Sequence, residues 1–257
     1  MKKTKNIAIG IDVGGSGIKG APVDLKTGQF VDERFRVPTP PNATPNEIAK
    51  IVRDVVNHFK LPDDVPVGIS FPAPIVRGVA PHIANLHKDF AGMNVANLMA
   101  KKLHRPVTVL NDADAAGYAE VYLGAASGFQ GTIMVLTLGT GIGSALVSNG
   151  VLVPNTELGH VFLPSGLEAE PFASSAVYER EGLSFEEWAA RLQEVFSHLE
   201  MLFSPDLFIV GGGISKKSEK FLPLISTRAP IVPAELLNAA GIVGAALMAS
   251  QEAGRKK

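Results

Sequence analysis

The same short pattern occurs twice in this chain, with more than 100 residues between the copies: an apolar strand, a glycine-rich turn and a returning strand. The first copy covers residues 7–13 and 18–23, and the second covers residues 132–138 and 144–147. Apolar runs joined by a glycine turn are typical of β-hairpins. A pattern repeated at this distance indicates a duplicated architecture, with one hairpin in each copy.

The segments around the hairpins alternate between strand and helix patterns. Two helices are predicted to begin with capping boxes, one with Thr44 and Glu47 and the other with Ser184 and Glu187. Further short strands are predicted at residues 34–37, 67–71, 107–110 and 207–210, and further helices at residues 113–122 and 241–249. This order of elements predicts an α/β fold with helices on the faces of its sheets.

Composition excludes several classes of protein. Hydrophobic residues make up 46% of the chain and charged residues 19%, which is too apolar for a disordered chain. The absence of Cys excludes disulfides, thiolate metal sites and a Cys nucleophile. No apolar run reaches the roughly 20 residues of a membrane span, and a net charge of −1 creates no field toward nucleic acid or a membrane. We therefore expect a cytoplasmic protein without nucleic-acid or membrane partners.

The first glycine turn, residues 12–17, reads Asp-Val-Gly-Gly-Ser-Gly. Glycine allows positive φ and a close approach of the backbone, whose N–H groups can then bind phosphate oxygens. The turn is not a Rossmann fingerprint because a strand follows it, and the P-loop spacing is absent. Asp12 could hold hydrated Mg²⁺ against a phosphate chain, and a plain tight hairpin is the alternative.

Two further glycine segments follow apolar strands. Residues 139–143 form the turn of the second hairpin, and residues 211–213 are three consecutive glycines. Two glycine hairpins that face each other could grip a polyphosphate from both sides. The triple glycine could offer a flat backbone surface to a base or to the far end of a phosphate chain, and a simple strand-to-helix turn is the alternative.

Two polar segments offer the side chains for chemistry. Asp112 follows an apolar strand, where a carboxylate commonly faces the active cleft of an α/β protein. It could accept the proton of a hydroxyl that attacks phosphorus, although Asp112 or Asp114 could instead cap the following helix. Glu157 and His160 are three residues apart and could converge on a small polar ligand, with a surface turn as the alternative.

Together and in this order, these segments resemble the sugar kinases of the ROK family, within the actin-like ATPase superfamily. The resemblance is closest to the branch of polyphosphate/ATP-dependent glucokinases and glucomannokinases. It rests on six motifs: the first phosphate motif at residues 12–20, the catalytic-base segment at 111–117, the second phosphate motif at 138–145, the sugar-binding segment at 153–160, the nucleotide-side motif at 204–217, and a further stretch at 227–234.

The resemblance implies a two-lobed actin-like ATPase (ribonuclease H-like) fold, in which duplicated sheet–helix domains flank a cleft. The expected domains are a small N-terminal one at residues 1–110 and a larger one at residues 111–257, with the last helix, about residues 241–251, packed back on the first. The implied reaction transfers a phosphoryl group from inorganic polyphosphate, ATP or both to the 6-hydroxyl of glucose, or of mannose. The resemblance also implies Mg²⁺, no structural zinc and a homodimer.

The resemblance assigns roles to individual residues. Asp112 is the implied general base. The implied sugar ligands are Asn85, Asn111, Asp112, Glu157, His160 and Glu170, the last from the similarity of residues 170–174 to the family's Glu-x-x-Ala-Ser segment. The implied donor site comprises Asp12, which would hold Mg²⁺ through water, and Gly14, Gly15, Ser16, Gly17, Lys19, Gly139, Thr140, Gly141, Gly211, Gly212 and Gly213.

The chain departs from the family pattern near the expected sugar pocket. Residues 161–166 are unlike the branch's usual segment and one residue longer, and Ala73 stands where the family usually has Gly. The residues after Asn85 also differ, so these departures bear on hexose selectivity more than on the reaction type. The Cys residues of the broad family's zinc site are absent.

Three alternatives stay open at this point. An ATP-only glucokinase would use the triple glycine equally well. A sugar-binding regulator would need a DNA-binding module, for which the six residues before Ile7 leave no room, and it would not need Asp112. An actin-like ATPase without a sugar would need neither Asn111 and Asp112 nor residues 157–160. For polyphosphate, we expect at least one of two basic clusters to line the donor cleft, Lys101, Lys102, His104 and Arg105, or Lys216, Lys217 and Lys220.

Overall fold

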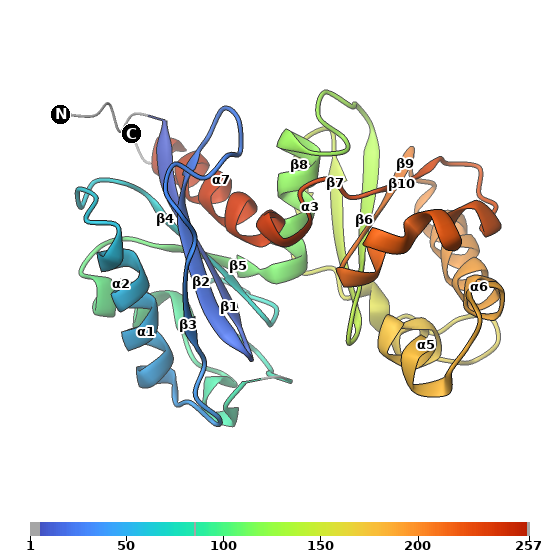
Figure 1. Ribbon diagram of the computed structural model, residues 1–257, viewed down its shortest axis with the longest axis horizontal. Helices are drawn as coiled ribbons and strands as arrows, with labels where there is room; N and C mark the ends of the chain where they lie inside the picture. The colour runs from blue at the N-terminus through green and yellow to red at the C-terminus, as the bar shows by residue number, and fades with distance from the viewer. Residues whose placement is uncertain (1–5, 85, 256–257) are drawn as a thin grey trace. The chain divides into compact units, whose positions relative to one another are not determined.

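The computed structural model describes residues 6–84 and 86–255, and it divides into two compact units (Figure 1). The first unit comprises Met1–Ala119 and Ala239–Lys257, and the second comprises Glu120–Asn238. The first unit thus extends to Ala119 rather than ending at residue 110, and it includes the last helix of the chain. In the described residues, no helix is long and apolar enough to cross a membrane.

The first unit is built on a five-stranded sheet of order β3-β2-β1-β4-β5. Strands β1 and β2 form the predicted antiparallel hairpin, and β3 pairs antiparallel with β2. Strands β4 and β5 run parallel to β1, so the carboxyl ends of these three strands share one edge of the sheet. The strands are β1 (Ile7–Gly14), β2 (Gly17–Asp24), β3 (Phe35–Pro38), β4 (Val67–Phe71) and β5 (Thr108–Asn111).

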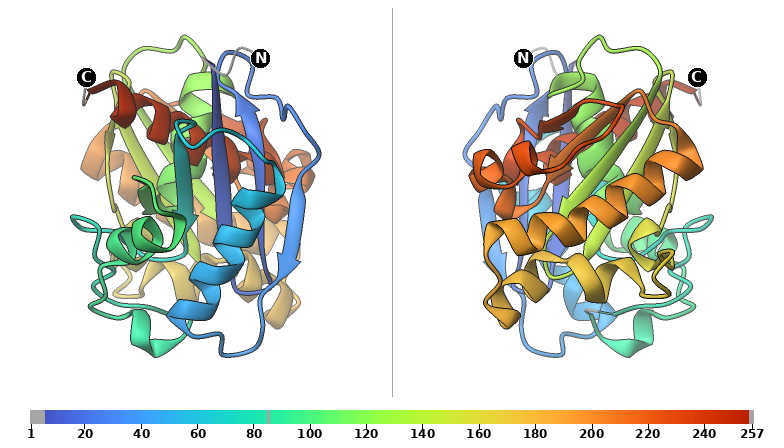
Figure 2. Two further views of the ribbon diagram at one scale, coloured as in Figure 1. Left: turned by 90° about the vertical axis from the view of Figure 1, so that its left-hand side faces the viewer. Right: turned by 90° about the vertical axis from the view of Figure 1, so that its right-hand side faces the viewer.

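Helices cover both faces of this sheet (Figure 2). Helix α1 (Pro45–His58) begins at the predicted capping box of Thr44, and it packs with α2 (Val95–Leu103) over the face that carries Ile9 and Ile11. Helix α7 (Ala240–Arg255) lies on the opposite face. A Cβ at Gly10 would lie 1.9 Å from the Ile242 carbonyl oxygen, so α7 rests directly on the backbone of β1.

The second unit repeats the sheet of the first. Its order is β10-β9-β6-β7-β8, with β6 and β7 in the predicted antiparallel hairpin and β9 and β10 parallel to β6. Counted from the hairpin side, the two sheets have the same topology, so the predicted duplication is confirmed. The strands are β6 (Thr132–Leu138), β7 (Ile142–Ser148), β8 (Val151–Val153), β9 (Leu207–Gly211) and β10 (Ile231–Pro233).

Helix α6 (Phe185–Phe203) packs its apolar face into the core of the second unit, and Ser184 caps it as predicted. Trp188 on this helix is fully buried, and its indole N–H donates to the Ala173 carbonyl oxygen at 2.9 Å. This places the sole Trp in the core. The remaining helices are α3 (Asp112–Leu123), which starts in the first unit, and α4 (Ala169–Ala173) and α5 (Ser175–Glu181) in the second.

Candidate functional site

The turn between β1 and β2 is fixed by side chains from outside the hairpin. The Thr39 hydroxyl donates to the Gly14 carbonyl at 2.7 Å, and Arg36 Nη2 donates to the Ser16 carbonyl at 2.8 Å. A Cβ at Gly17 would lie 2.6 Å from the Arg36 guanidinium. Neither Gly14 nor Gly17 has a left-handed φ. Close packing against Arg36, rather than the positive φ expected from the sequence, therefore favours glycine at position 17.

Asp12 lies beside this turn with a cation next to it. Asp12 and Lys19 are cross-strand partners, and Lys19 Nζ lies 2.9 Å from Asp12 Oδ2. The Ser70 hydroxyl donates to Asp12 Oδ1 at 3.4 Å. A Cβ at Gly241, in the first turn of α7, would lie 3.5 Å from Asp12 Cγ. The carboxylate is thus placed against the amino end of α7, which favours negative charge.

At the start of α3, the cap of the helix and the predicted catalytic base are two different residues. Asn111 is buried, and its Oδ1 accepts from the backbone N–H of Ala113 at 2.8 Å and of Asp114 at 3.1 Å. Asp112 Oδ1 also accepts from Ala113 N–H at 2.8 Å, yet the Asp112 side chain is exposed. Asn111 therefore supplies the cap that the sequence left to Asp112 or Asp114.

Strand register brings these groups to one edge of the first sheet. Asp12 on β1 is opposite Ser70 on β4, and Phe71 on β4 is opposite Asn111 on β5. The carboxyl ends of parallel strands are the usual position for ligand-binding side chains in α/β sheets. Asn85, predicted as a sugar ligand, lies outside the described residues.

The turn between β6 and β7 is held by the segment that carries α4 and α5. The Ser175 hydroxyl donates to the Gly139 carbonyl at 2.9 Å, and Glu170 Oε2 accepts from Ile142 N–H at 2.8 Å. A Cβ at Gly141 would lie 2.2 Å from that same carboxylate oxygen. Glu170, predicted as a sugar ligand, thus has one oxygen bonded to the predicted phosphate turn.

The triple glycine packs on the same turn. Gly211 ends β9, and Gly212 has a φ of 89° at the start of the 3-10 segment Gly213–Lys220. A Cβ at Gly212 would lie 2.2 Å from the carbonyl oxygen of Leu138, the residue before Gly139. The second unit therefore brings two of the predicted donor segments together, and the backbone itself requires glycine at position 212.

The segment of residues 157–160 is fastened to β7. Ser144 Oγ accepts from Leu158 N–H at 3.0 Å, and Ser144 is buried. A Cβ at Gly159 would lie 2.2 Å from the Ile142 carbonyl oxygen. The glycine between Glu and His therefore lets this turn lie flat on the strand, and the polar residues on either side of it are held in place.

His160 lies among three carboxylates, one of which the sequence analysis missed. Its Nδ1 is hydrogen-bonded to Glu168 Oε1 at 2.5 Å. The bond to Glu168 raises the pKa of His160; burial opposes this, and the charges of Glu170, Glu168 and Glu157 add to it. An acidic residue eight positions after a His carries no recognisable spacing, so only the acidic character of residues 157–170 could have suggested Glu168.

The predicted site residues that the structure describes thus form two groups, one in each unit. In the part of the chain that is described, no group of three or more His, Asp or Glu side chains could hold a metal ion. The group in the first unit is Asp12, Gly14, Gly15, Ser16, Gly17, Lys19, Asn111 and Asp112. The group in the second unit is Gly139, Thr140, Gly141, Glu157, His160, Glu170, Gly211, Gly212 and Gly213.

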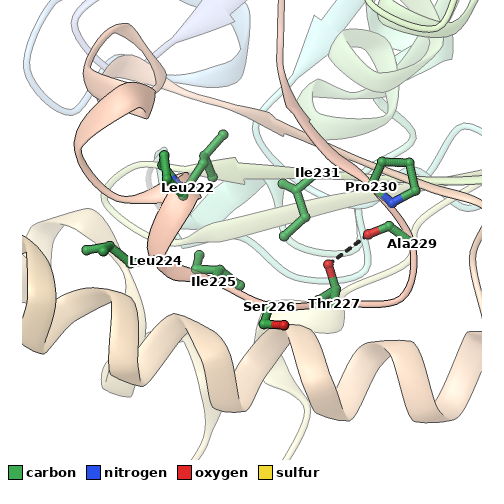
Figure 3. Close-up of a pocket in the computed structure, with 9 residues that line it drawn as sticks. Leu222, Leu224, Ile225, Ser226, Thr227, Ala229, Pro230 and Ile231 are labelled. Atoms are coloured by element: carbon green, nitrogen blue, oxygen red, sulfur yellow. Dashed lines mark hydrogen bonds between the residues drawn. The ribbon is translucent and has the colours of Figure 1, made fainter.

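One hollow in the structure is lined by a predicted site residue, and another is not. One, of about 280 Å³, lies in the first unit beside Gly15 and is also lined by Thr39 and His87. The other, of about 350 Å³, lies in the second unit along residues 222–231 (Figure 3). There the Thr227 hydroxyl donates to the Ala229 carbonyl at 2.7 Å. This second hollow contains none of the predicted site residues.

Comparison with known proteins gives consistent matches along the chain. The model of the ROK family matches residues 8–173. Polyphosphate glucokinase of Mycobacterium tuberculosis (strain CDC 1551 / Oshkosh) is 46% identical over 245 residues, which cover 95% of this chain and 91% of that protein. The crystal structure of inorganic polyphosphate/ATP-glucomannokinase from Arthrobacter sp. strain KM is 50% identical, with a TM-score of 0.86 and coverage of 98% of this chain and 99% of that one. A ROK family glucokinase from Streptomyces griseus, in complex with glucose and AMPPNP, is 25% identical, with a TM-score of 0.78 and coverage of 95% and 99%.

Proposed function

The chain belongs to the ROK family, and from this premise we propose that it transfers a phosphoryl group from inorganic polyphosphate or ATP to the 6-hydroxyl of glucose. Its duplicated α/β topology is that of the ROK sugar kinases, the actin-like ATPase fold. The observation that carries the proposal is 46% identity to a polyphosphate glucokinase over 95% of the chain. The 50% identity to a glucomannokinase supports mannose as a second acceptor.

On the acceptor side, Asp112 acts as the general base. It takes the proton of the sugar 6-hydroxyl as that oxygen attacks phosphorus. The cap from Asn111 supports this role, because the helix does not depend on the Asp112 carboxylate for its N-terminal bonds. Glu157 and His160, with Asn85 and Asn111, bind the sugar hydroxyls, and a wrong epimer would leave such polar groups unpaired.

On the donor side, the phosphates lie against the two glycine hairpins and the triple glycine. Phosphoryl transfer needs a positioned nucleophile and neutralised charge more than covalent help from the protein. Lys19 supplies a positive charge beside the first turn. The close packing at Gly212 supports a rigid backbone for the donor, since a Cβ there would meet the backbone of Leu138.

The residues around Asp12 fit Mg²⁺ bound with the donor. Asp12 offers carboxylate oxygens, the ligand type that Mg²⁺ prefers, and its side chain is partly exposed at 22%. The metal ion, when bound, offsets the negative charge of the phosphate chain. Asp12 would hold it through water.

The family resemblance also supports a homodimer. Met201 and Leu202, near the end of α6, are 67% and 50% exposed, so this helix end offers an apolar surface for a second copy. Light scattering after size exclusion would give the mass in solution. A single-chain mass at micromolar protein would contradict the dimer.

The function is tested by measuring sugar 6-phosphate from glucose and from mannose, each with polyphosphate and with ATP at matched Mg²⁺. Product from polyphosphate that is lost in Asp112→Asn supports the proposal. Product from ATP alone would instead identify an ATP-only glucokinase. ATP hydrolysis that ignores added sugar would point to an ATPase, and no product from folded protein with either donor would overturn the proposal.

A further inference from the structure

The His160 ring is held by one nitrogen although its side chain is largely exposed. The side chain is 55% exposed, and Nδ1 lies 2.5 Å from Glu168 Oε1. Glu168 is less exposed, at 33%. An exposed imidazole would ordinarily rotate between conformers, so a short bond to a more buried carboxylate fixes its orientation. The bond leaves Nε2 as the ring nitrogen for a ligand.

Glu168 is itself held by the backbone on both sides. Phe162 and Glu168 form an antiparallel bridge, and Ala169 N–H donates to the Val161 carbonyl at 3.0 Å. Gly166, with a φ of 82°, makes the turn between them. Residues 161–168 thus form a small closed loop that returns to the residue following His160. The loop fixes the Cα of Glu168 relative to the imidazole.

The side chain of Glu168 bonds His160 and does not cap its own helix, α4. Glu168 occupies the N-cap position of α4, yet its side chain makes no capping hydrogen bond. A carboxylate at this position would normally bond the free backbone N–H groups of the first turn. By bonding the imidazole, Glu168 leaves the first turn of α4 without a side-chain cap, which lowers the stability of the helix end. Such a loss is expected when the contact with the imidazole serves another purpose.

The bond at Nδ1 determines whether Nε2 of His160 accepts or donates a hydrogen bond. A carboxylate at Nδ1 keeps a proton on that nitrogen, and this decides what Nε2 can do. In the neutral ring Nε2 only accepts a hydrogen bond, whereas in the charged ring it donates one. The carboxylates that face the ring are Glu157 and, at and beside the start of α4, Glu168 and Glu170, and all three favour the charged form.

We propose that Glu168 is the positioning residue for His160: it holds the ring by Nδ1 so that Nε2–H donates to a hexose hydroxyl oxygen. The proposal rests on the proposed hexokinase function, which makes His160 a sugar ligand. Glu168 contacts no reacting atom and acts only through His160. Its loss therefore affects hexose affinity, whereas the phosphoryl-transfer step and donor affinity are spared.

Two substitutions separate charge from orientation. Glu168→Gln keeps an oxygen that can accept from Nδ1–H but removes the negative charge. It should raise KM for glucose by up to about 10-fold at pH values between the His160 pKa of the variant and the higher pKa of the wild type, and leave it within about twofold near pH 6, where the ring is charged without help. Glu168→Ala also removes the anchor and should raise KM about 10-fold at both pH values. In both variants kcat and KM for the donor should stay close to wild type.

A second readout does not depend on activity. NMR titration of the His160 ring protons, assigned with His160→Asn, should give a lower pKa in Glu168→Gln than in wild type. Glu179→Gln is the matched control, since Glu179 is an exposed acidic residue on α5. The control should change neither the His160 pKa nor KM for glucose.

An unchanged His160 pKa in Glu168→Gln, or a glucose KM in Glu168→Ala within twofold of wild type, would overturn the proposal. Equal losses of kcat and of affinity for both substrates would also overturn it, because they would indicate a general structural role. If the wild type phosphorylated no hexose, the proposed function would fail instead. Glucose affinity by calorimetry and the His160 titration would then still decide the role of Glu168.

Discussion

Glu170 Oε2 accepts a hydrogen bond from the backbone N–H of Ile142 at 2.8 Å, so a carboxylate expected at the sugar also supports the predicted phosphate turn. Its own helix, α4, is too short to be stable alone. The turn therefore keeps Glu170 in place as much as Glu170 supports the turn. A change on either side of this contact should affect binding of both substrates.

The first prediction concerns Gly141→Ala. The new Cβ would lie 2.2 Å from Glu170 Oε2, so the carboxylate must leave the Ile142 N–H. Overpacking of this kind typically costs about 1–3 kcal/mol. Urea denaturation should show this loss, and KM should rise for both glucose and the phosphate donor.

Gly139→Ala is the control in the same turn. No atom lies within 4 Å of a Cβ at Gly139, and its φ is not left-handed. Its free energy of unfolding should stay within about 0.5 kcal/mol of wild type. Equal destabilisation by the two substitutions would show that the Glu170 contact does not explain the glycine at 141.

The second prediction concerns Asp112→Asn. Removal of a general base should lower kcat by about 10²–10⁴-fold. Stability should hardly change, because Asn111 Oδ1 already accepts from Ala113 N–H and Asp114 N–H. Steady-state kinetics, glucose calorimetry and urea denaturation measure the three quantities, and glucose binding should persist.

Asn111→Ala, unlike Asp112→Asn, should lower the stability of the protein. It removes the cap of α3 and should cost about 1 kcal/mol of unfolding free energy. Asp64→Asn, at an exposed carboxylate elsewhere in the first unit, should change neither kcat nor stability. A kcat for Asp112→Asn within tenfold of wild type would remove Asp112 as the base.

Features that depend on local sequence could be predicted. The two hairpins, the capping boxes at Thr44 and Ser184 and the buried face around Trp188 all lie within a few residues of their signals. Elements with weak local signals were missed, such as β10 (Ile231–Pro233), a three-residue strand that only its parallel pairing with β9 defines. The sequence also gives no clear signal for helix α2, although the basic residues at its end are evident.

Contacts that depend on how the chain folds could not be predicted from the sequence. Asn111, Asp112 and Asp114 are all good N-cap types, and only the geometry of the strand end selects Asn111. The Glu168 bond to His160 exists because residues 161–168 close a loop, which no spacing rule describes. The sequence therefore predicts the candidate site only as residue types in order, and it does not predict the contacts that support those residues.

The third prediction concerns the two basic clusters. Lys101 and Lys102 lie in the last turn of α2, where positive charge stabilises a helix end. Lys216 and Lys217 are exposed on the segment that follows the triple glycine. Charge reversal of Lys216 and Lys217 should raise KM for polyphosphate several-fold and weaken its salt dependence.

The same reversal at Lys101 and Lys102 should act mainly on stability. Kinetics with polyphosphate at several salt concentrations would separate the two clusters. If neither double variant changed KM or its salt dependence, the basic-track hypothesis would be abandoned, and the donor site would consist of the glycine segments and Lys19 alone.

The last prediction concerns Glu200 at the end of α6. Burial raises its pKa, but hydrogen bonds from the backbone N–H groups of Ala229 and Arg228, together with the charge of Arg228, outweigh burial, so the pKa lies below its ordinary value of 4.5. A lowered folded pKa stabilises the protein above the ordinary value, and this stability is lost as pH falls through the folded pKa. Glu200→Gln should therefore cost about 1–3 kcal/mol near pH 7 and progressively less below about pH 4.5, measured by urea denaturation. A cost independent of pH would show that the charge of Glu200 does not matter.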